Sequence, residues 1–186
     1  MIHLTTPLTF EKIKDLKPGD RVLLSGVIYT SRDAAHKRYM GMIEKGEPLP
    51  FDLKDGTIYF AGPAPAAPGE VIGSCGPTTS YRMDAYSPTL LDHGLRAMIG
   101  KGKRNDEVID AIKRNHGIYF AAIGGAGAVI SSSIKKCDVI AFEDLGTEAV
   151  RRLEVEDMPL VVAISCDGED LYKIGRKKYL GVKENA

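Results

Sequence analysis

A chain of 186 residues with 44% hydrophobic and 27% charged side chains can bury one ordinary core and is too apolar to be disordered. Because 25 basic and 25 acidic side chains balance, no charge excess marks the chain as a binder of nucleic acid or anionic membranes. No apolar run is long enough to cross a bilayer and residues 1–10 lack a signal-peptide pattern, so we expect a cytoplasmic protein.

The first half of the chain favours strands and loops around one helix. Alternation of Val22, Leu24 and Ile28 is typical of a strand that buries one face. In chain order, the patterns predict a turn at 16–20, a strand at 21–28, a helix at 34–45 that Gly46 ends, strands at 57–61 and 71–74, and a rigid proline-rich loop at 63–69.

The second half alternates helix and strand. Serine at the cap and proline in the first turn open a helix at Ser87-Pro88, and Asn105 caps another. The patterns predict helices from 88 to Gly100, at 106–115, at 126–134 and around 148–153, strands at 118–123, 139–142 and 160–165, and a strand-like tail at 171–182. This mixture predicts one α/β domain over residues 1–186 with a mixed sheet.

A first cationic segment, residues 30–38, lies where the first strand becomes a helix. Free N–H groups at a helix start attract anions, and Arg32 at that place opposes the helix dipole unless an anion lies nearby. His36 is four residues further on and shares a helix face with Arg32. Alternatively, Asp33 only caps the helix and neutralises Arg32, and His36 is a packed or surface histidine.

A second segment, residues 73–84, leaves a predicted strand and carries consecutive hydroxyl side chains. Hydroxyls and N–H groups in a tight turn can hold an oxyanion, and Arg82 follows Thr78 by four residues. The planar fork of arginine suits a carboxylate because it binds both oxygens. Alternatively, Thr78 or Thr79 is an ordinary helix cap and Arg82 lies on the surface.

A third segment places Lys101 between Gly100 and Gly102 after a predicted helix. It lacks the spacing of a phosphate-binding P-loop, and a solvated helix end is the alternative. A further glycine cluster at 124–127 lacks the dinucleotide-binding spacing. Together, the three cationic segments predict a site for a small dianion, without specifying a reaction.

Cysteine usage gives no metal or disulfide pattern. Cys75, Cys137 and Cys166 are odd in number and widely spaced, which fits neither a disulfide framework nor a paired metal motif. We therefore expect buried thiols in a reducing compartment.

Several segments in a fixed order resemble the beta subunit, or C-terminal domain, of class I iron–sulfur fumarate hydratases and L-tartrate dehydratases. They are Leu4-Thr5-Thr6-Pro7-Leu8, the turn at 16–20, Thr30-Ser31-Arg32-Asp33-Ala34-Ala35-His36, Gly76-Pro77-Thr78-Thr79-Ser80-Tyr81-Arg82-Met83-Asp84, Ile99-Gly100-Lys101-Gly102 and Gly124-Gly125-Ala126. The resemblance covers nearly the whole chain, and its most specific parts are Arg-Asp-x-Ala-His followed by Gly-Pro-Thr-Thr-x-x-Arg-Met-Asp.

This resemblance implies a swivelling β/β/α domain and reversible hydration of fumarate to L-malate, a step of the tricarboxylic acid cycle. In that family a [4Fe–4S] cluster acts as a Lewis acid and is held by cysteines of the alpha subunit. Cys75, Cys137 and Cys166 lie outside those motifs, so we assign no metal ligand here. We expect a hetero-oligomer that is active only with the alpha subunit, and a homodimer as a form of the isolated chain.

The same resemblance assigns roles to individual residues. Arg32, Arg82 and Lys101 would bind the carboxylates of the substrate, and Thr79 would donate a hydrogen bond to one of them. Thr78 would lie at the reacting carbon as a base, activated by a carboxylate of the partner because a free threonine hydroxyl is a poor base.

Three further residues would orient these groups and take no direct part in the reaction: Asp33, His36 and Asp84. The nearest alternative function is L(+)-tartrate dehydratase, since both families share the motifs. A stand-alone dicarboxylate-binding or regulatory module is a second alternative, distinguished by the absence of a neighbouring gene for an alpha subunit. A purely structural subunit would not need Thr78, Arg82 and Lys101 together.

Overall fold

Seven strands form one mixed sheet, in the order β1-β2-β3-β4-β5-β7-β6, in the computed structural model, which describes residues 1–122 and 127–184. The strands are β1 (Ile2–Thr5), β2 (Arg21–Thr30), β3 (Thr57–Tyr59), β4 (Ala97–Gly100), β5 (Ile118–Ala121), β6 (Ile134–Ala141) and β7 (Val150–Ile164). Neighbouring strands from β1 to β5 pair in parallel, whereas β7 is antiparallel to β2, β5 and β6. The predicted α/β class and mixed sheet are confirmed.

The sheet closes on itself because β2 also pairs with β7, which in turn pairs with β5. Side chains on the parallel strands alternate between two cores. Ile99 and Phe120 lie in the core enclosed by the sheet. Met98 and Tyr119, their neighbours in sequence, pack in a second core on the other face. Strands buried on both faces explain the continuous apolar runs of the sequence.

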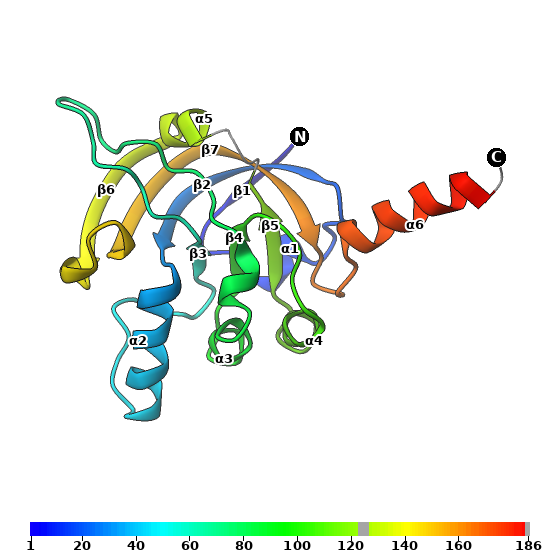
Figure 1. Cartoon of the computed structure of the whole chain (residues 1–186), viewed down its shortest axis with the longest axis horizontal. Helices are drawn as coiled ribbons and strands as arrows, with labels where there is room; N and C mark the ends of the chain where they lie inside the picture. Colours follow the sequence, from blue (N-terminus) through cyan, green and yellow to red (C-terminus); the bar gives the residue numbers. More distant parts are fainter. Residues whose placement is uncertain (123–126, 185–186) are drawn as a thin grey trace.

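The helices that cover the second core lie together on one side of the sheet (Figure 1). They are α2 (Asp33–Glu44), α3 (Ser87–Asp92) and α4 (Asp106–Asn115), and the 3-10 turn η1 (Ser80–Met83) adds Met83 to the same core. The 3-10 turn η2 (Glu143–Glu148) and α6 (Leu171–Glu184) pack against its edge, whereas α1 (Phe10–Ile13) and α5 (Gly127–Ser132) contribute to the other core. In Figure 1, α5 lies across the sheet from α2, and α6 extends away from the body towards the C-terminus.

Two helix predictions hold closely. α4 begins after Asn105, whose side-chain oxygen accepts a hydrogen bond from the N–H of Val108 at 2.9 Å, as a capping residue should. α2 ends before Gly46, which adopts φ +68°, a conformation that glycine tolerates without steric cost.

The predicted helix from 88 to Gly100 is wrong in its second half. α3 ends at Asp92, Gly94 turns the chain with φ +105°, and Ala97–Gly100 forms β4 between β3 and β5. The periodicity of a short apolar run cannot distinguish a buried strand from a helix. This segment is a strand because it pairs with β3 and β5. The cap also differs, because Tyr86 precedes the helix and the Ser87 hydroxyl donates to the carbonyl of Met83 at 2.9 Å.

Three other sequence predictions are wrong. The tail is the helix α6, whose first turn is fixed by Asp170 accepting the N–H of Tyr172 at 2.9 Å. The helix expected around 148–153 is instead the end of η2 and the start of β7, which pairs there with β2 and β6. Residues 71–74 form no strand; Gly73 packs so closely against the carbonyl of Pro65 that a Cβ would lie 2.4 Å from it.

Candidate active site

The three cationic segments meet at one edge of the sheet. β2 runs parallel to β3 and β3 to β4, so the residues that follow these strands leave the sheet at the same edge. The second segment is added there through isolated bridges, in which Pro77 pairs with Ala61 and Thr79 pairs with Lys101. Ligands of α/β proteins bind in the crevice at the carboxyl ends of parallel strands, which is where these segments lie.

Asp33 joins the first segment to the second. Its Oδ1 forms an ion pair with Arg82, 2.8 Å from Nε, and its Oδ2 lies 3.8 Å from Nε of Arg32. Asp33 makes no capping bond to α2; the N–H of Ala34 donates to Oε2 of Glu148 at 3.0 Å instead. The alternative in which Asp33 only caps the helix is therefore wrong.

The guanidinium group of Arg32 is confined from several sides. Oε1 of Glu148 lies 3.4 Å from its Nη2, and the side chains of both residues are 22% exposed. A Cβ on Gly62 would lie 3.1 Å from Nη1 and 3.0 Å from the carbonyl oxygen of Thr147, so only glycine leaves this space. Glu148 and Gly62 carried no sequence signal for this role, because both contacts are long-range.

His36 is fully buried beneath this cluster. Its Nδ1 lies 2.8 Å from the carbonyl oxygen of Arg32 and 3.0 Å from Oγ of Ser31, and in the tautomer with a proton on Nδ1 the ring donates to that carbonyl. Nε2 has no partner among the described residues. Burial, reinforced by the nearby charge of Arg104, lowers the pKa of His36 to about 4. His36 is therefore neutral near pH 7 and holds the main chain at Arg32.

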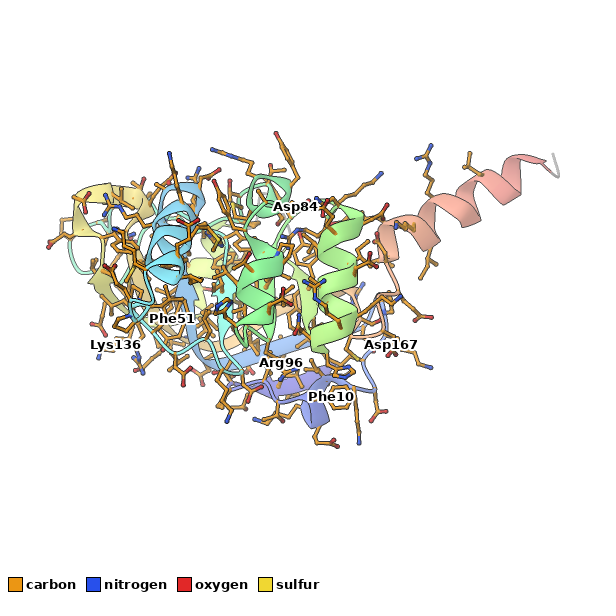
Figure 2. All side chains as sticks on the ribbon, turned by 90° about the horizontal axis from the view of Figure 1, so that it is seen from below. Phe10, Phe51, Asp84, Arg96, Lys136 and Asp167 are labelled. Carbon is orange, nitrogen blue, oxygen red and sulfur yellow. The ribbon has the colours of Figure 1, made fainter. Side chains whose placement is uncertain are left out.

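Asp84 lies below the second segment and forms a buried ion pair that sequence reasoning missed. Its Oδ1 accepts from Nε of Arg104 at 2.6 Å, and the two side chains are 9% and 0% exposed. Its Oδ2 accepts the N–H of Asn105 at 2.8 Å, beside the start of α4 (Figure 2). Arg104 also lies over the rings of Phe60 and Tyr119. Asp84 thus connects η1 to α4 and to the residues just after Gly100-Lys101-Gly102, which we call the lysine segment.

Thr78, Thr79 and Lys101 occupy the open part of this edge. The N–H of Thr78 donates to the carbonyl of Phe60 at 2.7 Å, which fixes its main chain. Both threonines are half-buried, and within residues 1–122 and 127–184 their hydroxyls make no hydrogen bond. Lys101 exchanges hydrogen bonds with Ser80, through main-chain N–H groups at 3.0 and 2.9 Å, and its side chain is exposed.

The charges at this edge favour an anion. Arg32, Arg82 and Lys101 outnumber Asp33 and Glu148, the acidic side chains that contact the two arginines. In the described part of the chain, Asp33 is the only acidic side chain paired with Arg82, and the printed contact is at Nε. A guanidinium edge of this kind can bind both oxygens of a carboxylate.

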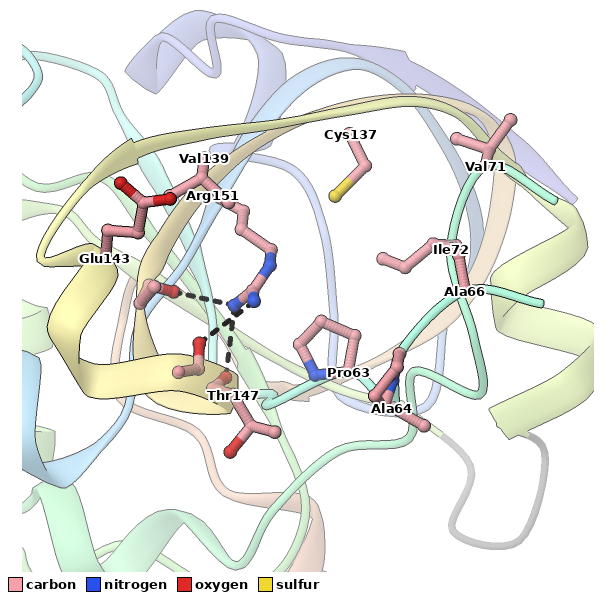
Figure 3. A pocket seen from close by; sticks show the side chains of 13 residues that line it. Pro63, Ala64, Ala66, Val71, Ile72, Cys137, Val139, Glu143, Thr147 and Arg151 are labelled. Carbon is pink, nitrogen blue, oxygen red and sulfur yellow. Dashed lines mark hydrogen bonds between the residues drawn. The ribbon is translucent and has the colours of Figure 1, made fainter. Parts of the chain in front are cut away.

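A separate cleft of about 480 Å³ lies beside this edge, against β6 and the loop at 63–72 (Figure 3). Its walls include Cys137, Val139 and Arg151 but none of the residues predicted from the sequence. The guanidinium of Arg151 donates to main-chain carbonyls of η2 and the residue after it at 3.0–3.1 Å, so these donors are not available to an anion. We therefore place the candidate site at the cationic edge.

The cysteines do not fit an iron–sulfur cluster. Burial raises the pKa of the Cys75 thiol to about 12, which opposes the thiolate that a cluster needs. Among the described residues, no group of three or more His, Cys, Asp or Glu side chains is placed to hold a metal ion. In the same part of the chain, every helix is too short or too polar to span a bilayer. The glycine segment at 124–126, part of the resemblance, lies outside the described residues.

Comparison with known proteins places the chain in one family. The family model described as fumarase C-terminus matches residues 1–175. Fumarate hydratase 2 of Leishmania major is 40% identical over 164 residues, which are 87% of this chain and 29% of the relative. The anaerobic class I fumarate hydratase of Escherichia coli strain K12 is 41% identical over 155 residues, 82% of this chain and 28% of the relative.

A third relative has nearly the same length as this chain. The protein of Methanocaldococcus jannaschii provisionally named L(+)-tartrate dehydratase subunit beta is 39% identical over 184 residues, 96% of this chain and 94% of the relative. The chain thus spans about 30% of the fumarate hydratases it matches and nearly all of the tartrate dehydratase subunit. This chain belongs to the fumarase C-terminus family.

Proposed function

We propose that this chain is the beta subunit of a two-subunit class I fumarate hydratase, which adds water reversibly to fumarate and gives L-malate. The observation that carries the proposal is the meeting of Arg32, Arg82 and Lys101 at one edge of the sheet in a member of this family. Positive charges placed close together favour a dianionic substrate, because the attraction between charges strengthens as their separation falls.

In the proposed site, each residue of this chain has a defined task. Arg82, held through Nε by Asp33, binds one carboxylate with both Nη groups, and Arg32 and Lys101 bind the other. Thr79 donates a hydrogen bond to a carboxylate. Thr78 lies at the reacting carbon and accepts a proton there, which requires a carboxylate of the partner as its activator.

The charge excess has a chemical use in this proposal. Arg32, Arg82 and Lys101 exceed Asp33 and Glu148 by one, so this edge carries a net charge of about +1 before the substrate binds. Proton removal beside a carboxylate develops an additional negative charge in the transition state, and a preorganised cation stabilises it more than it stabilises the substrate. Arg32 and Arg82 would therefore lower the barrier as well as bind, whereas Lys101 acts in binding.

The alpha subunit is part of the proposal. A [4Fe–4S] cluster held by that subunit supplies the Lewis acid, since the thiols of Cys75, Cys137 and Cys166 are protonated and lie outside the site. The relatives are three times longer or, in one case, named as a subunit, which supports a partner that supplies the rest. We further propose a cytoplasmic hetero-oligomer acting in the tricarboxylic acid cycle, in which this chain is a swivelling β/β/α domain.

L(+)-tartrate dehydratase is the second candidate. It is favoured by the relative from Methanocaldococcus jannaschii, which this chain covers over 94% of its length. Tartrate carries a hydroxyl on each central carbon, so the residues that distinguish the two substrates must contact that position. A dicarboxylate-binding module without catalysis is the remaining candidate.

One experiment separates these candidates. The chain is co-expressed with an alpha subunit of the same family, under anaerobic conditions, and is assayed with fumarate and with L-tartrate. Turnover of fumarate by the pair and not by the chain alone is expected. Turnover of tartrate alone would replace the first proposal with the second. No turnover of either substrate with an intact cluster would leave the binding module, which calorimetric titration of malate into the chain would then test.

A further inference from the structure

The lysine segment is held in place by two tyrosine hydroxyls from other parts of the chain. The N–H of Gly102 donates to the hydroxyl oxygen of Tyr172 at 3.2 Å. The carbonyl of the same residue accepts from the hydroxyl of Tyr119 at 2.9 Å. Gly102 has φ +86°, a conformation that other residues adopt only with strain. Both main-chain groups of the residue after Lys101 are thus fixed from outside its own loop.

Lys101 and the preceding Gly100 are both held against the side chain of Ser80. The N–H of Lys101 donates to Oγ of Ser80 at 3.0 Å, and this Oγ lies 2.9 Å from the Tyr119 hydroxyl. A Cβ on Gly100 would lie 2.0 Å from the same Oγ. If Ser80 donates to Tyr119 and Tyr119 donates to Gly102, each hydroxyl proton has one acceptor.

Tyr172 differs from the other members because it belongs to α6. Ser80 and Tyr119 are buried in the body of the protein, whereas α6 leaves the body near Asp170 and extends outward (Figure 1). Tyr172 is half-buried in the first turn, at the point where this helix meets the lysine segment. The direction of the lysine segment therefore depends on the C-terminal helix.

We propose that Tyr172 is a positioning residue that orients Lys101 towards the substrate carboxylate. This inference rests on the proposed function, since it takes Lys101 as a substrate-binding residue. Without the Tyr172 hydroxyl, the N–H of Gly102 loses its acceptor and the loop samples orientations in which Lys101 faces away. The affinity for the dicarboxylate is then reduced, while the environment of the reacting carbon and of Thr78 is unchanged.

The first test is made on the chain alone and does not depend on activity. Tyr172→Phe removes one oxygen and keeps the ring. Tyr29→Phe is the matched control, because the Tyr29 ring stacks on Phe51 and its hydroxyl makes no hydrogen bond in the described part of the chain. Amide hydrogen exchange at Gly102, followed by NMR, is expected to accelerate about fivefold in Tyr172→Phe only. An unchanged rate at Gly102 would overturn the proposal.

The second test uses the complex with the alpha subunit. In Tyr172→Phe, KM for the dicarboxylate is expected to rise about fivefold while kcat stays within about twofold, and Tyr29→Phe keeps both constants. An unchanged KM, or a loss confined to kcat, would contradict a positioning role for Tyr172. If the wild-type complex turns over neither substrate, the proposed function fails, while the exchange rate at Gly102 still decides whether Tyr172 fixes the loop.

Discussion

Asp33 forms an ion pair with Arg82, in which Oδ1 lies 2.8 Å from Nε. The ion pair joins the first turn of α2 to η1, two elements that are far apart in the sequence. With its acidic partner 2.8 Å from Nε, Arg82 can present its two outer nitrogens to both oxygens of one carboxylate. Asp33 thus orients Arg82 and does not occupy its substrate-binding edge.

Replacing Arg82 tests this geometry. Arg82→Lys keeps the charge but presents a single rotating ammonium in place of a planar fork. We expect Arg82→Lys to lose nearly as much fumarate hydration as Arg82→Ala, about tenfold or more in kcat/KM, measured in the complex with the alpha subunit. Full activity in Arg82→Lys would show that charge alone suffices at this position.

A matched control lies on α2. Arg38 pairs with Asp144 on the surface, and its side chain is 39% exposed. Arg38→Lys makes the same chemical change away from the site, so kcat/KM should stay at the wild-type value. A loss in this control equal to that in Arg82→Lys would indicate a general effect of removing arginine.

Gly62 tests the confinement of Arg32. A Cβ at this position would lie 3.1 Å from Cδ and Nη1 of Arg32, which must move by a few tenths of an ångström. Gly62→Ala should therefore raise KM about threefold to tenfold, because a small displacement of a substrate-binding group is costly. Steady-state kinetics of the complex measure the effect, and an unchanged KM would show that Arg32 adjusts freely.

Gly41 is the control for adding a methyl group. It lies inside α2, and a Cβ there would meet nothing within 4 Å. Gly41→Ala should keep KM and stabilise the fold by about 0.5–1 kcal/mol, since alanine favours the helix and restricts the unfolded chain. Urea unfolding of the isolated chain measures this gain, and a loss of stability would contradict the described environment of Gly41.

Local signals predicted part of this fold correctly. Asn105 is a capping residue with its acceptor in sequence range, so α4 could be placed from the sequence. Ala97–Gly100 could not be placed, because a short apolar run takes the state that its neighbours impose. The tail at 171–182 extends away from the body as a helix, so its wrong prediction reflects local helix propensity and the Asp170 contact, which the pattern did not weigh.

The contacts around the candidate site could be predicted only in part, and the roles of its residues stay predictions. Arg32, Arg82 and Lys101 lie in motifs with turn residues and could be selected from the sequence. Arg104 and Glu148 reach the site only through tertiary contacts with Asp84 and Ala34, which no spacing in the sequence encodes. A buried ion pair and a long-range helix cap form only when the folded sheet brings distant segments of the chain together.

The Asp84–Arg104 pair should be essential for stability. Arg104 has no exposed side-chain surface, so Asp84→Ala leaves a buried charge without its partner. We expect a loss of about 3–5 kcal/mol in the free energy of unfolding, measured with urea. Asp92→Ala, which breaks an exposed pair with Arg114, should change the midpoint little. Equal midpoints for the two variants would show that burial does not set the strength of the Asp84 contact.

His36 should make the stability depend on pH in a defined window. Burial lowers its pKa to about 4, while the nearby charge of Arg104 also lowers it and Asp33 opposes the change. The unfolded histidine has a pKa of about 6.5, so between these values the unfolded chain binds more protons than the folded chain. The stability that the neutral His36 contributes is therefore fully present above about pH 6.5. It is lost as the pH falls towards 4, by about 1.4 kcal/mol per pH unit.

The test compares urea unfolding at pH 7.5 and pH 5.0. His36→Gln cannot be protonated, so the difference between the two pH values should shrink by about 2 kcal/mol relative to the wild type. His93→Gln changes an exposed histidine and should keep the full difference. If His36→Gln loses as much stability on acidification as the wild type, other groups cause the loss, and His36 accepts a proton in the folded state without penalty.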